Sequence, residues 1–328
     1  MFVGRKDELV AISNTLSKPN QHIMIHGNRR VGKSFLINEA LRNLDISSIH
    51  FECMKTSLEL NLEALINQLY SFGIINIKIN SSFFDLFTYL NSLNKRLVIV
   101  FDEFPYLYIK NDKDKVETLF QKLLDQYSTN INVIISGSNI GTMKALIKKK
   151  NALFGRFNTI IHLLEFNYYE ASLFYPHLSN YDKVALYAVF GGSPYVLCQL
   201  DETKSLKENI CNTLLNIFSS IYNYSSQNYT SDIPTRSNFE SIFKVIGNSK
   251  VKYKQIENKL HYEPNGLLSK QLESLIEMGF LTKNYPINKI NDAKKTSYSI
   301  VSNIIRFYYT YIYGNENIIT TLGKRSFL

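Results

Sequence analysis

Residues 27–34 read GNRRVGKS, which is the glycine, lysine and hydroxyl spacing of a phosphate-binding loop. The glycines permit backbone conformations that other residues resist, so that successive N–H groups can turn inward around an anion. Lys33 would reach the β- and γ-phosphates of a nucleotide, and Ser34 would offer its hydroxyl to Mg²⁺. The candidate nucleotide contacts are Gly27, Asn28, Arg29, Arg30, Val31, Gly32, Lys33, Ser34 and Phe35.

The segments on either side of this loop predict a strand before it and a helix after it. Residues 21–26 alternate polar and apolar side chains, and apolar residues then recur at helical spacing from Phe35 to Leu41. This context gives the glycine-rich match its meaning, because a helix that begins near Lys33 adds the positive end of its dipole. A chance match to the pattern is the alternative interpretation.

A second element of the same chemistry lies at residues 96–104, RLVIVFDEF. Its continuous apolar run is typical of a strand buried on both faces in a parallel sheet. Asp102 would hold Mg²⁺ through the water shell of the ion, and Glu103 would polarise the attacking water as a general base. The alternative is that the two acids only solvate the end of a strand.

The elements that would position these side chains alternate along residues 20–163. A third strand is predicted at residues 131–139, where the sequence SGSN brings small polar groups to the carboxyl end, a place where ligands gather in open sheets. Helices are predicted at residues 58–72, 82–94 and 113–127. This alternation predicts an α/β fold with a doubly wound parallel sheet, the core of a P-loop NTPase.

Six motifs then come in the order of one family: FVGRKDEL (2–9), GNRRVGKS (27–34), DEFPYL (102–107), SGSNIGTM (136–143), FGRF (154–157) and FGGSPYVL (190–197). Across about residues 2–313 the chain resembles the AAA+-like P-loop ATPases of the STAND type from archaea and bacteria. The resemblance implies an ATPase core at residues 1–165, a helical lid at 166–232, a winged helix-turn-helix at 233–300, and a C-terminal helix and tail at 301–328.

The resemblance also implies roles that the spacing leaves open. Arg5, with Glu8, would lie beside the adenine pocket. Ser138 would be the polar sensor at the γ-phosphate, on a strand between the loop strand and the acid strand. Pro194 would pack near the base and couple the nucleotide to the lid. Arg156 would approach the terminal phosphate, where a guanidinium offsets developing charge, although a salt bridge on a helix surface is the alternative.

Residues 239–300 predict three helices and a hairpin, the outline of a winged helix-turn-helix. The window 250–300 holds nine lysines against five acids. Lys270 would lie near the start of the third helix, where side chains reach a major groove, and Lys294 and Lys295 would lie in the wing. These lysines favour double-stranded DNA as a partner, bound mostly through its phosphates. The alternative is a solvated face on a regulatory domain that packs against the ATPase core.

The composition is that of a globular protein with a sizeable core, with 45% hydrophobic and 20% charged residues. Three cysteines without CxxC spacing argue against a disulfide framework. No run approaches the roughly 18 apolar residues of a membrane span, and the charged N-terminus lacks a signal-peptide core. These features indicate the cytoplasm and no membrane partner. The net charge of +9 permits an anionic partner, but a genomic bias in composition explains it equally well.

Two functions follow from these patterns. The first is a Mg²⁺-dependent ATPase that acts as a switch, in which the nucleotide controls the lid and the winged helix. The second is a DNA-binding or regulatory module that holds ATP with little turnover. The pair Asp102–Glu103 favours the first, because a loop that only binds nucleotide does not need a general base. A small-molecule kinase is a weak third interpretation, because no acceptor site is evident downstream.

Two expectations concern the limits of the chain and its assembly. Longer relatives carry a nuclease-like domain after the region that this chain resembles. The residues between 313 and Leu328 are too few for such a domain, so we expect a shortened member or a fragment without nuclease activity. The protein partner could be a second copy of the chain or another protein. Whether Arg156 acts within its own chain depends on this assembly.

Overall fold

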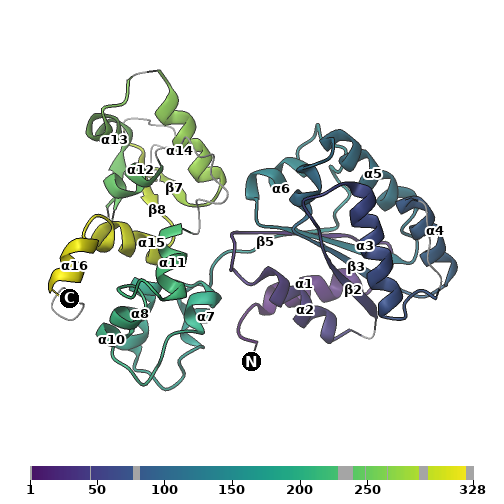
Figure 1. Ribbon diagram of the computed structural model, residues 1–328, viewed down its shortest axis with the longest axis horizontal. Coiled ribbons are helices and arrows are strands. Elements are labelled where there is room, and N and C mark those ends of the chain that lie inside the picture. The colour runs from purple at the N-terminus through teal and green to yellow at the C-terminus, as the bar shows by residue number, and fades with distance from the viewer. Residues whose placement is uncertain are drawn as a thin grey trace.

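The computed structural model describes residues 2–44, 46–76, 82–227, 239–247, 249–263, 265–287 and 295–322. The chain forms two bodies that lie side by side in Figure 1. We refer to residues 2–165 as the core body and to the described part of residues 166–322 as the C-terminal body. No helix in the described ranges is long and apolar enough to span a membrane.

The core body is built on a parallel sheet of five strands in the order β2-β3-β4-β1-β5. The strands are β1 (Ile23–His26), β2 (Ser47–Glu52), β3 (Leu97–Asp102), β4 (Ile131–Gly137) and β5 (Thr159–His162). Every residue of β3 and β4 is buried, which explains their continuous apolar sequences. The predicted parallel sheet is confirmed, and the sensor strand β4 lies between the loop strand and the acid strand.

Helices cover both faces of this sheet, because alternate strand residues point to opposite sides. One face packs on α1 (Lys6–Leu16) and α2 (Lys33–Arg42), and the other on α3 (Leu58–Ser71), α4 (Phe83–Ser92), α5 (Lys113–Gln126) and a 3₁₀ helix (Phe104–Tyr108). Ser57, Ser82 and Asp112 cap the first turns of α3, α4 and α5, so these helices begin close to where the sequence predicts them. The short helix α6 (Ile140–Leu146) precedes β5.

The C-terminal body begins with short helices: α7 (Tyr168–Ser172), α8 (Asn180–Phe190), α9 (Pro194–Leu197), α10 (Leu206–Asn212) and α11 (Ser220–Gln227). The next elements are α12 (Phe239–Ile246), β6 (Val251–Lys252), α13 (Tyr253–Leu260), α14 (Leu267–Glu277), β7 (Leu281–Asn284) and β8 (Ser297–Ile300), whose strands form an antiparallel sheet in the order β6-β8-β7. The last are α15 (Asn303–Phe307), a π-helical turn (Tyr308–Ile312) and α16 (Glu316–Leu322). The expected boundary at residues 232–233 lies outside the described residues.

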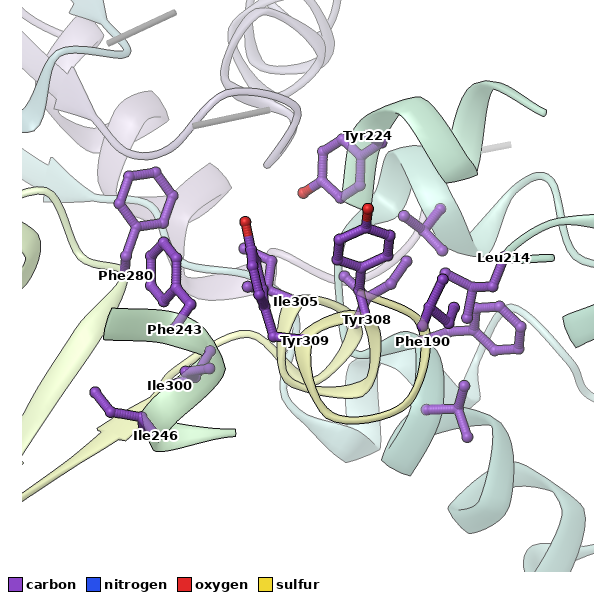
Figure 2. Close-up of a cluster of buried hydrophobic side chains, with 14 of the residues drawn as sticks. Phe190, Leu214, Tyr224, Phe243, Ile246, Phe280, Ile300, Ile305, Tyr308 and Tyr309 are labelled. Atoms are coloured by element: carbon purple, nitrogen blue, oxygen red, sulfur yellow. The ribbon is translucent and has the colours of Figure 1, made fainter. Parts of the chain in front are cut away.

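One continuous hydrophobic core runs through the C-terminal body. The segment from α15 through the π-helical turn lies at its centre, as Figure 2 shows. Tyr309 packs on Phe243 of α12 with ring centroids 5.2 Å apart, whereas Tyr308 lies on the side of Phe190 and Leu214. The helices expected to form the lid and the elements expected to form the winged helix therefore bury side chains in the same core, which the sequence pattern did not predict.

Candidate nucleotide-binding site

The phosphate-binding loop leaves the carboxyl end of β1 and enters α2, as its sequence predicts. A Cβ atom on Gly27 would lie 2.1 Å from the backbone oxygen of Leu163, so no larger residue fits there. Gly32 has a φ of +93°, in the left-handed region that favours glycine. Lys33 is buried, and its Nζ donates to the carbonyls of Gly27 (2.9 Å) and Asn28 (3.0 Å). An ammonium group is thus held inside the loop where an anion would bind.

The two expected metal-binding residues are in direct contact. Ser34 Oγ donates to Asp102 Oδ2 at 2.6 Å, and Ser136 Oγ donates to the other carboxylate oxygen. Burial by itself would raise the pKa of Asp102, but hydrogen bonds from His50, Ser136 and Ser34 outweigh it and hold this pKa well below its usual range. Asp102 is therefore a carboxylate at the junction between the loop and the acid strand.

The candidate base and the candidate sensor also form a pair. Glu103 follows β3 with a left-handed backbone (φ +50°), and its Oε2 accepts hydrogen bonds from Ser138 Oγ (2.9 Å) and Ser138 N (3.2 Å). The left-handed turn points the side chain of Glu103 across the edge of the sheet towards β4. Sequence analysis predicted the two residues separately, and the structure brings them together.

A cavity of about 420 Å³ lies in front of these groups. Its lining is polar and partly basic: Arg29, Arg30, Gly32, Lys33, Ser34, Phe35, Glu52, Glu103 and Tyr106. Arg29 Nη2 lies 3.4 Å from the hydroxyl of Tyr106, and the side chain of Phe35 is 70% exposed at the rim. The loop therefore borders a space that Lys33, Ser34 and Glu103 line together.

Arg5 ties the N-terminal segment to the loop. Its guanidinium donates to the carbonyls of Val31 (3.3 Å) and Leu164 (2.5 Å) and lies over the ring of Phe166 at 4.2 Å. It also forms an ion pair with Glu8 at 3.3 Å. Arg5 thus links the N-terminal segment to the loop, and Glu8 is connected to the loop through Arg5.

The C-terminal body meets the loop through α9 and its neighbours. The Cγ atom of Pro194 lies 3.4 Å from the place that a Cβ atom on Gly32 would take, and Ser193 Oγ donates to the carbonyl of Arg30 at 3.2 Å. The guanidinium of Arg30 lies 3.9 Å above the ring of Tyr195. A cation over an aromatic face is attractive, so Arg30 connects the loop directly to the C-terminal body.

Arg156 lies at the amino ends of the strands, opposite the carboxyl ends where the loop lies. It precedes β5, and the nearby Asn158 N donates to His22 O at 2.8 Å, beside the amino end of β1. Its guanidinium pairs with Asp125 at the end of α5, with Nη2–Oδ2 at 2.8 Å. The loop lies at the carboxyl end of β1, so this arrangement does not bring Arg156 to the phosphate site of its own chain. The structure shows the salt bridge that was the alternative interpretation.

The lysines expected to contact DNA divide into described and undescribed positions. Lys270 is exposed on α14, but Glu273 and Glu277 are exposed on the same side of this helix. Lys295 is exposed, and Lys294 lies outside the described residues. The exposed side of α14 therefore carries mixed charge.

His50, which the motifs did not indicate, lies at this site, with its Nε2 atom 3.0 Å from Asp102 Oδ2. The available signal was the alternation in SSIHFE at residues 47–52, which predicts a strand with a half-exposed face. Strand β2 pairs in parallel with β3, and Glu52 is opposite Asp102. A strand at that place would have brought His50 to the acid pair.

The residues present fit a nucleotide with Mg²⁺. The glycines, Lys33 and the start of α2 suit phosphate groups, and hydroxyl and carboxylate oxygens suit Mg²⁺. Among the described residues no group of three His, Cys, Asp or Glu side chains could hold a metal. An ion at this site would rest on Ser34, on Asp102 through water, and on phosphate oxygens, which is how Mg²⁺ is usually bound with nucleotides.

The sequence and the fold of this chain are similar to those of known proteins. The chain is 26% identical over 326 residues to the uncharacterized protein MJECL04 of Methanocaldococcus jannaschii, which covers 97% of this chain and 70% of that protein. The structure is similar to the Walker-type ATPase PABY2304 of Pyrococcus abyssi, with a TM-score of 0.70, 16% identity, and coverage of 94% of this chain and 96% of that one. It is also similar to the ORC2 protein of Aeropyrum pernix, solved in ADPNP-ADP complexes, with a TM-score of 0.59, 12% identity, and coverage of 97% and 95%.

At these identities the two solved structures show a shared fold. The sequence match is more specific: residues 2–200 match the family ATPase_2, described as an ATPase domain predominantly from Archaea. This match spans more than half of the 328 residues, and the chain belongs to this family of ATPase domains.

Proposed function

We propose that the protein binds ATP with Mg²⁺ at the carboxyl edge of β1, β3 and β4 and hydrolyses it. The hydrogen bond of 2.6 Å between Ser34 Oγ and Asp102 Oδ2 carries this proposal. It joins the phosphate-binding loop to the acid strand at the point where both would meet the ion. Glu103 and Ser138 lie beside this contact, so the groups needed for phosphate binding, metal binding and proton transfer share one edge of the sheet.

The proposed roles follow from the chemistry of each group. Lys33 would turn from the loop carbonyls to the β- and γ-phosphates, and Ser138 would contact the terminal phosphate. Mg²⁺, when bound by Ser34 and through water by Asp102, would neutralise charge on these phosphates. Glu103 would accept a proton from the attacking water, which requires it to turn from Ser138.

We extend the proposal to a STAND-type switch in which the nucleotide controls the C-terminal body. Contacts of this body with the loop include Arg30, which lies over Tyr195, and Gly279, where a Cβ atom would lie 3.5 Å from the Asn28 side chain. A change in loop conformation on nucleotide binding would therefore alter the contacts of α9 and of the turn after α14. The boundary proposed near residue 165 is supported by the cores, because Leu163 packs in the core body and Phe166 in the C-terminal body.

The test is phosphate release from ATP in Mg²⁺ and in EDTA, with and without duplex DNA. We expect release that requires Mg²⁺. Tight ATP binding with no release above background under any condition would overturn hydrolysis and leave the module that binds ATP with little turnover. Absence of ATP binding would overturn the site itself.

A second proposal concerns DNA. The order of α12, β6, α13, α14, β7 and β8 supports a winged helix, and its described part of residues 250–300 exposes seven lysines: Lys250, Lys252, Lys254, Lys259, Lys270, Lys283 and Lys295. If these lysines bind phosphates, replacing Lys270, Lys294 and Lys295 by alanine should flatten the slope of log K against log salt by roughly 2 to 3. Fluorescence anisotropy at several salt concentrations measures this slope. No binding by the wild type at low salt would leave the regulatory alternative.

For Arg156 we propose that any contact with a terminal phosphate is made in a second copy of the chain. Its position at the amino edge of the sheet supports this, because the loop of its own chain lies at the opposite edge. A turnover per chain that rises with protein concentration in the wild type but not in Arg156→Ala would support it, and equal dependence in both would contradict it.

A further inference from the structure

His50 is anchored on three sides at the end of β2. Its Nε2 lies 3.0 Å from Asp102 Oδ2, and its Nδ1 lies 3.0 Å from Asn38 Oδ1 on α2. Its backbone oxygen accepts a hydrogen bond of 2.9 Å from Gln68 Nε2 on α3. The ring is therefore fixed in plane and direction by groups on both sides, and not only by its contact with the acid.

The carboxylate of Asp102 has all four of its acceptor positions filled by the protein. Oδ1 accepts from Ser136 Oγ and from the backbone N of Glu103 (3.0 Å). Oδ2 accepts from Ser34 Oγ (2.6 Å) and, with the ring proton on Nε2, from His50 Nε2 (3.0 Å). Three of these donors come from the loop and from the strands β3 and β4 that already form the site. His50 is the donor from outside them, on the edge strand β2.

His50 contacts the oxygen of Asp102 that lies nearest the proposed metal site. Oδ2 is the oxygen shared with Ser34, and the proposed ion would lie at this pair. A cavity of about 520 Å³ opens at the same place, and Ser34, His50 and Asp102 line it together with Asn38 and Gln68. Without His50, Oδ2 would keep one donor and face this cavity, so the carboxylate could turn towards water.

We propose that His50 is a positioning residue for the metal site: it holds Asp102 Oδ2 towards Ser34, so that the carboxylate receives the water shell of Mg²⁺ without first reorienting. The inference rests on the proposed Mg²⁺-dependent nucleotide site and adds to it a residue from β2. Groups that orient a metal-binding carboxylate typically contribute about 10- to 100-fold in metal affinity. A purely structural role, in which His50 only closes the end of β2, would not affect the metal in particular.

The test separates these roles by measuring nucleotide affinity with and without the metal. The probe is a non-hydrolysable ATP analogue, titrated by calorimetry in Mg²⁺ and in EDTA. The ratio of the two affinities is the gain due to the metal. We expect His50→Ala to bind the analogue like the wild type in EDTA, and to lose about tenfold of the gain in Mg²⁺. His50→Gln, which keeps an N–H donor, should recover most of it.

Two further variants serve as controls. Asn38→Ala removes the partner on the other ring nitrogen and should lose a smaller part of the gain. His177→Ala changes an exposed histidine between α7 and α8 and should change nothing. Thermal unfolding of each variant shows whether it is folded. If His50→Ala does not fold, the variants His50→Gln and Asn38→Ala still test the proposal.

The possible outcomes are distinct. An equal gain from Mg²⁺ in His50→Ala and the wild type overturns the positioning role, and so does a loss of affinity in His50→Ala that is the same in EDTA and in Mg²⁺. Both results leave the nucleotide site intact. A wild type that fails to bind the analogue in either condition overturns the proposed function, and the role of His50 with it.

Discussion

Both bodies have apolar cores, but they differ in the contacts that bring distant segments of the chain together. In the core body, polar side chains from separate strands converge at one edge of the sheet and bond to one another, as Asp102 does with Ser34, Ser136 and His50. In the C-terminal body, the unifying feature is a continuous apolar core in which Tyr309 and Tyr308 of one segment serve both halves. The first arrangement brings polar groups together at one site, whereas the second joins helices and strands in one shared core.

The difference suggests how the two bodies work together. The C-terminal body touches the phosphate-binding loop at Arg30 and Asn28, next to the residues proposed to bind phosphate. Because its helices share one core, a displacement at α9 would move α12 and α14 with it. Under the proposed function, the core body would carry out the chemistry and the C-terminal body would follow the loop as one part.

The largest expected effect is on the binding of ATP by the core body. Replacing Lys33 by alanine removes the ammonium group from the loop. Hydrogen bonds to charged groups contribute about 1.5–3 kcal/mol each, so loss of contacts to two phosphates should weaken ATP binding by about 10²- to 10⁴-fold. Calorimetry measures the affinity, and thermal unfolding without nucleotide should change little. An unchanged affinity would contradict the assignment of the loop.

The next effect concerns the shared core of the C-terminal body. Phe243 is fully buried between Phe280 and Tyr309, and Phe→Ala in such a core costs about 3–5 kcal/mol of unfolding free energy. We expect Phe243→Ala to raise amide exchange in α8 and α14 together, with β1 and β4 unaffected. The matched variant Phe120→Ala, in the core of the other body, should do the reverse. Exchange that increases in α14 but not in α8 would show two independent units.

A smaller effect depends on pH and belongs to the core body. His22 is buried and its Nδ1 accepts a hydrogen bond from Val133 N at 3.2 Å, and burial lowers the pKa of His22 from 6.5 to about 4. The unfolded chain therefore binds the proton more readily between these values. The contribution of neutral His22 to the free energy of unfolding is therefore complete above pH 6.5. We expect about 3 kcal/mol of this free energy to be lost as the pH falls from 6.5 through 4.

Urea unfolding at pH 7, 5.5 and 4.5 measures this dependence. His22→Gln, which keeps an acceptor at this position but does not titrate, should lose less stability than the wild type over the same interval. Identical losses in the two proteins would show that other groups cause the acid sensitivity of the core body.

The sequence predicted most of the core body for a physical reason. A glycine loop between a strand and a helix, and two acids after a buried strand, are local patterns whose meaning depends on a few neighbouring residues. Strands β1, β3 and β4 and helices α3, α4 and α5 therefore begin and end close to the expected residues. The side-chain pairings within the site, such as Ser138 with Glu103, depend on how β3 and β4 align and could not be read from the pattern.

The remaining differences have specific causes. Strand β2 is as long as β3, but it lies at the sheet edge and is half exposed, so it lacks the apolar run that marked β3, and His50 was missed with it. Arg156 was judged by its motif, although its place three residues before β5 indicates the amino edge of the sheet. The shared core of the C-terminal body joins Phe190 to Tyr308, and pairings between residues so far apart have no signature in a single sequence.

The most direct test of the central claim is the rate of ATP hydrolysis by Glu103→Gln in saturating Mg²⁺ and ATP. The substitution keeps the size of the side chain and an oxygen for Ser138, but removes the group proposed to accept the proton. We expect ATP affinity close to that of the wild type and a turnover lower by about 100-fold, the size of effect typical for loss of a general base. Equal turnover in the two proteins would contradict hydrolysis at this site by the proposed base.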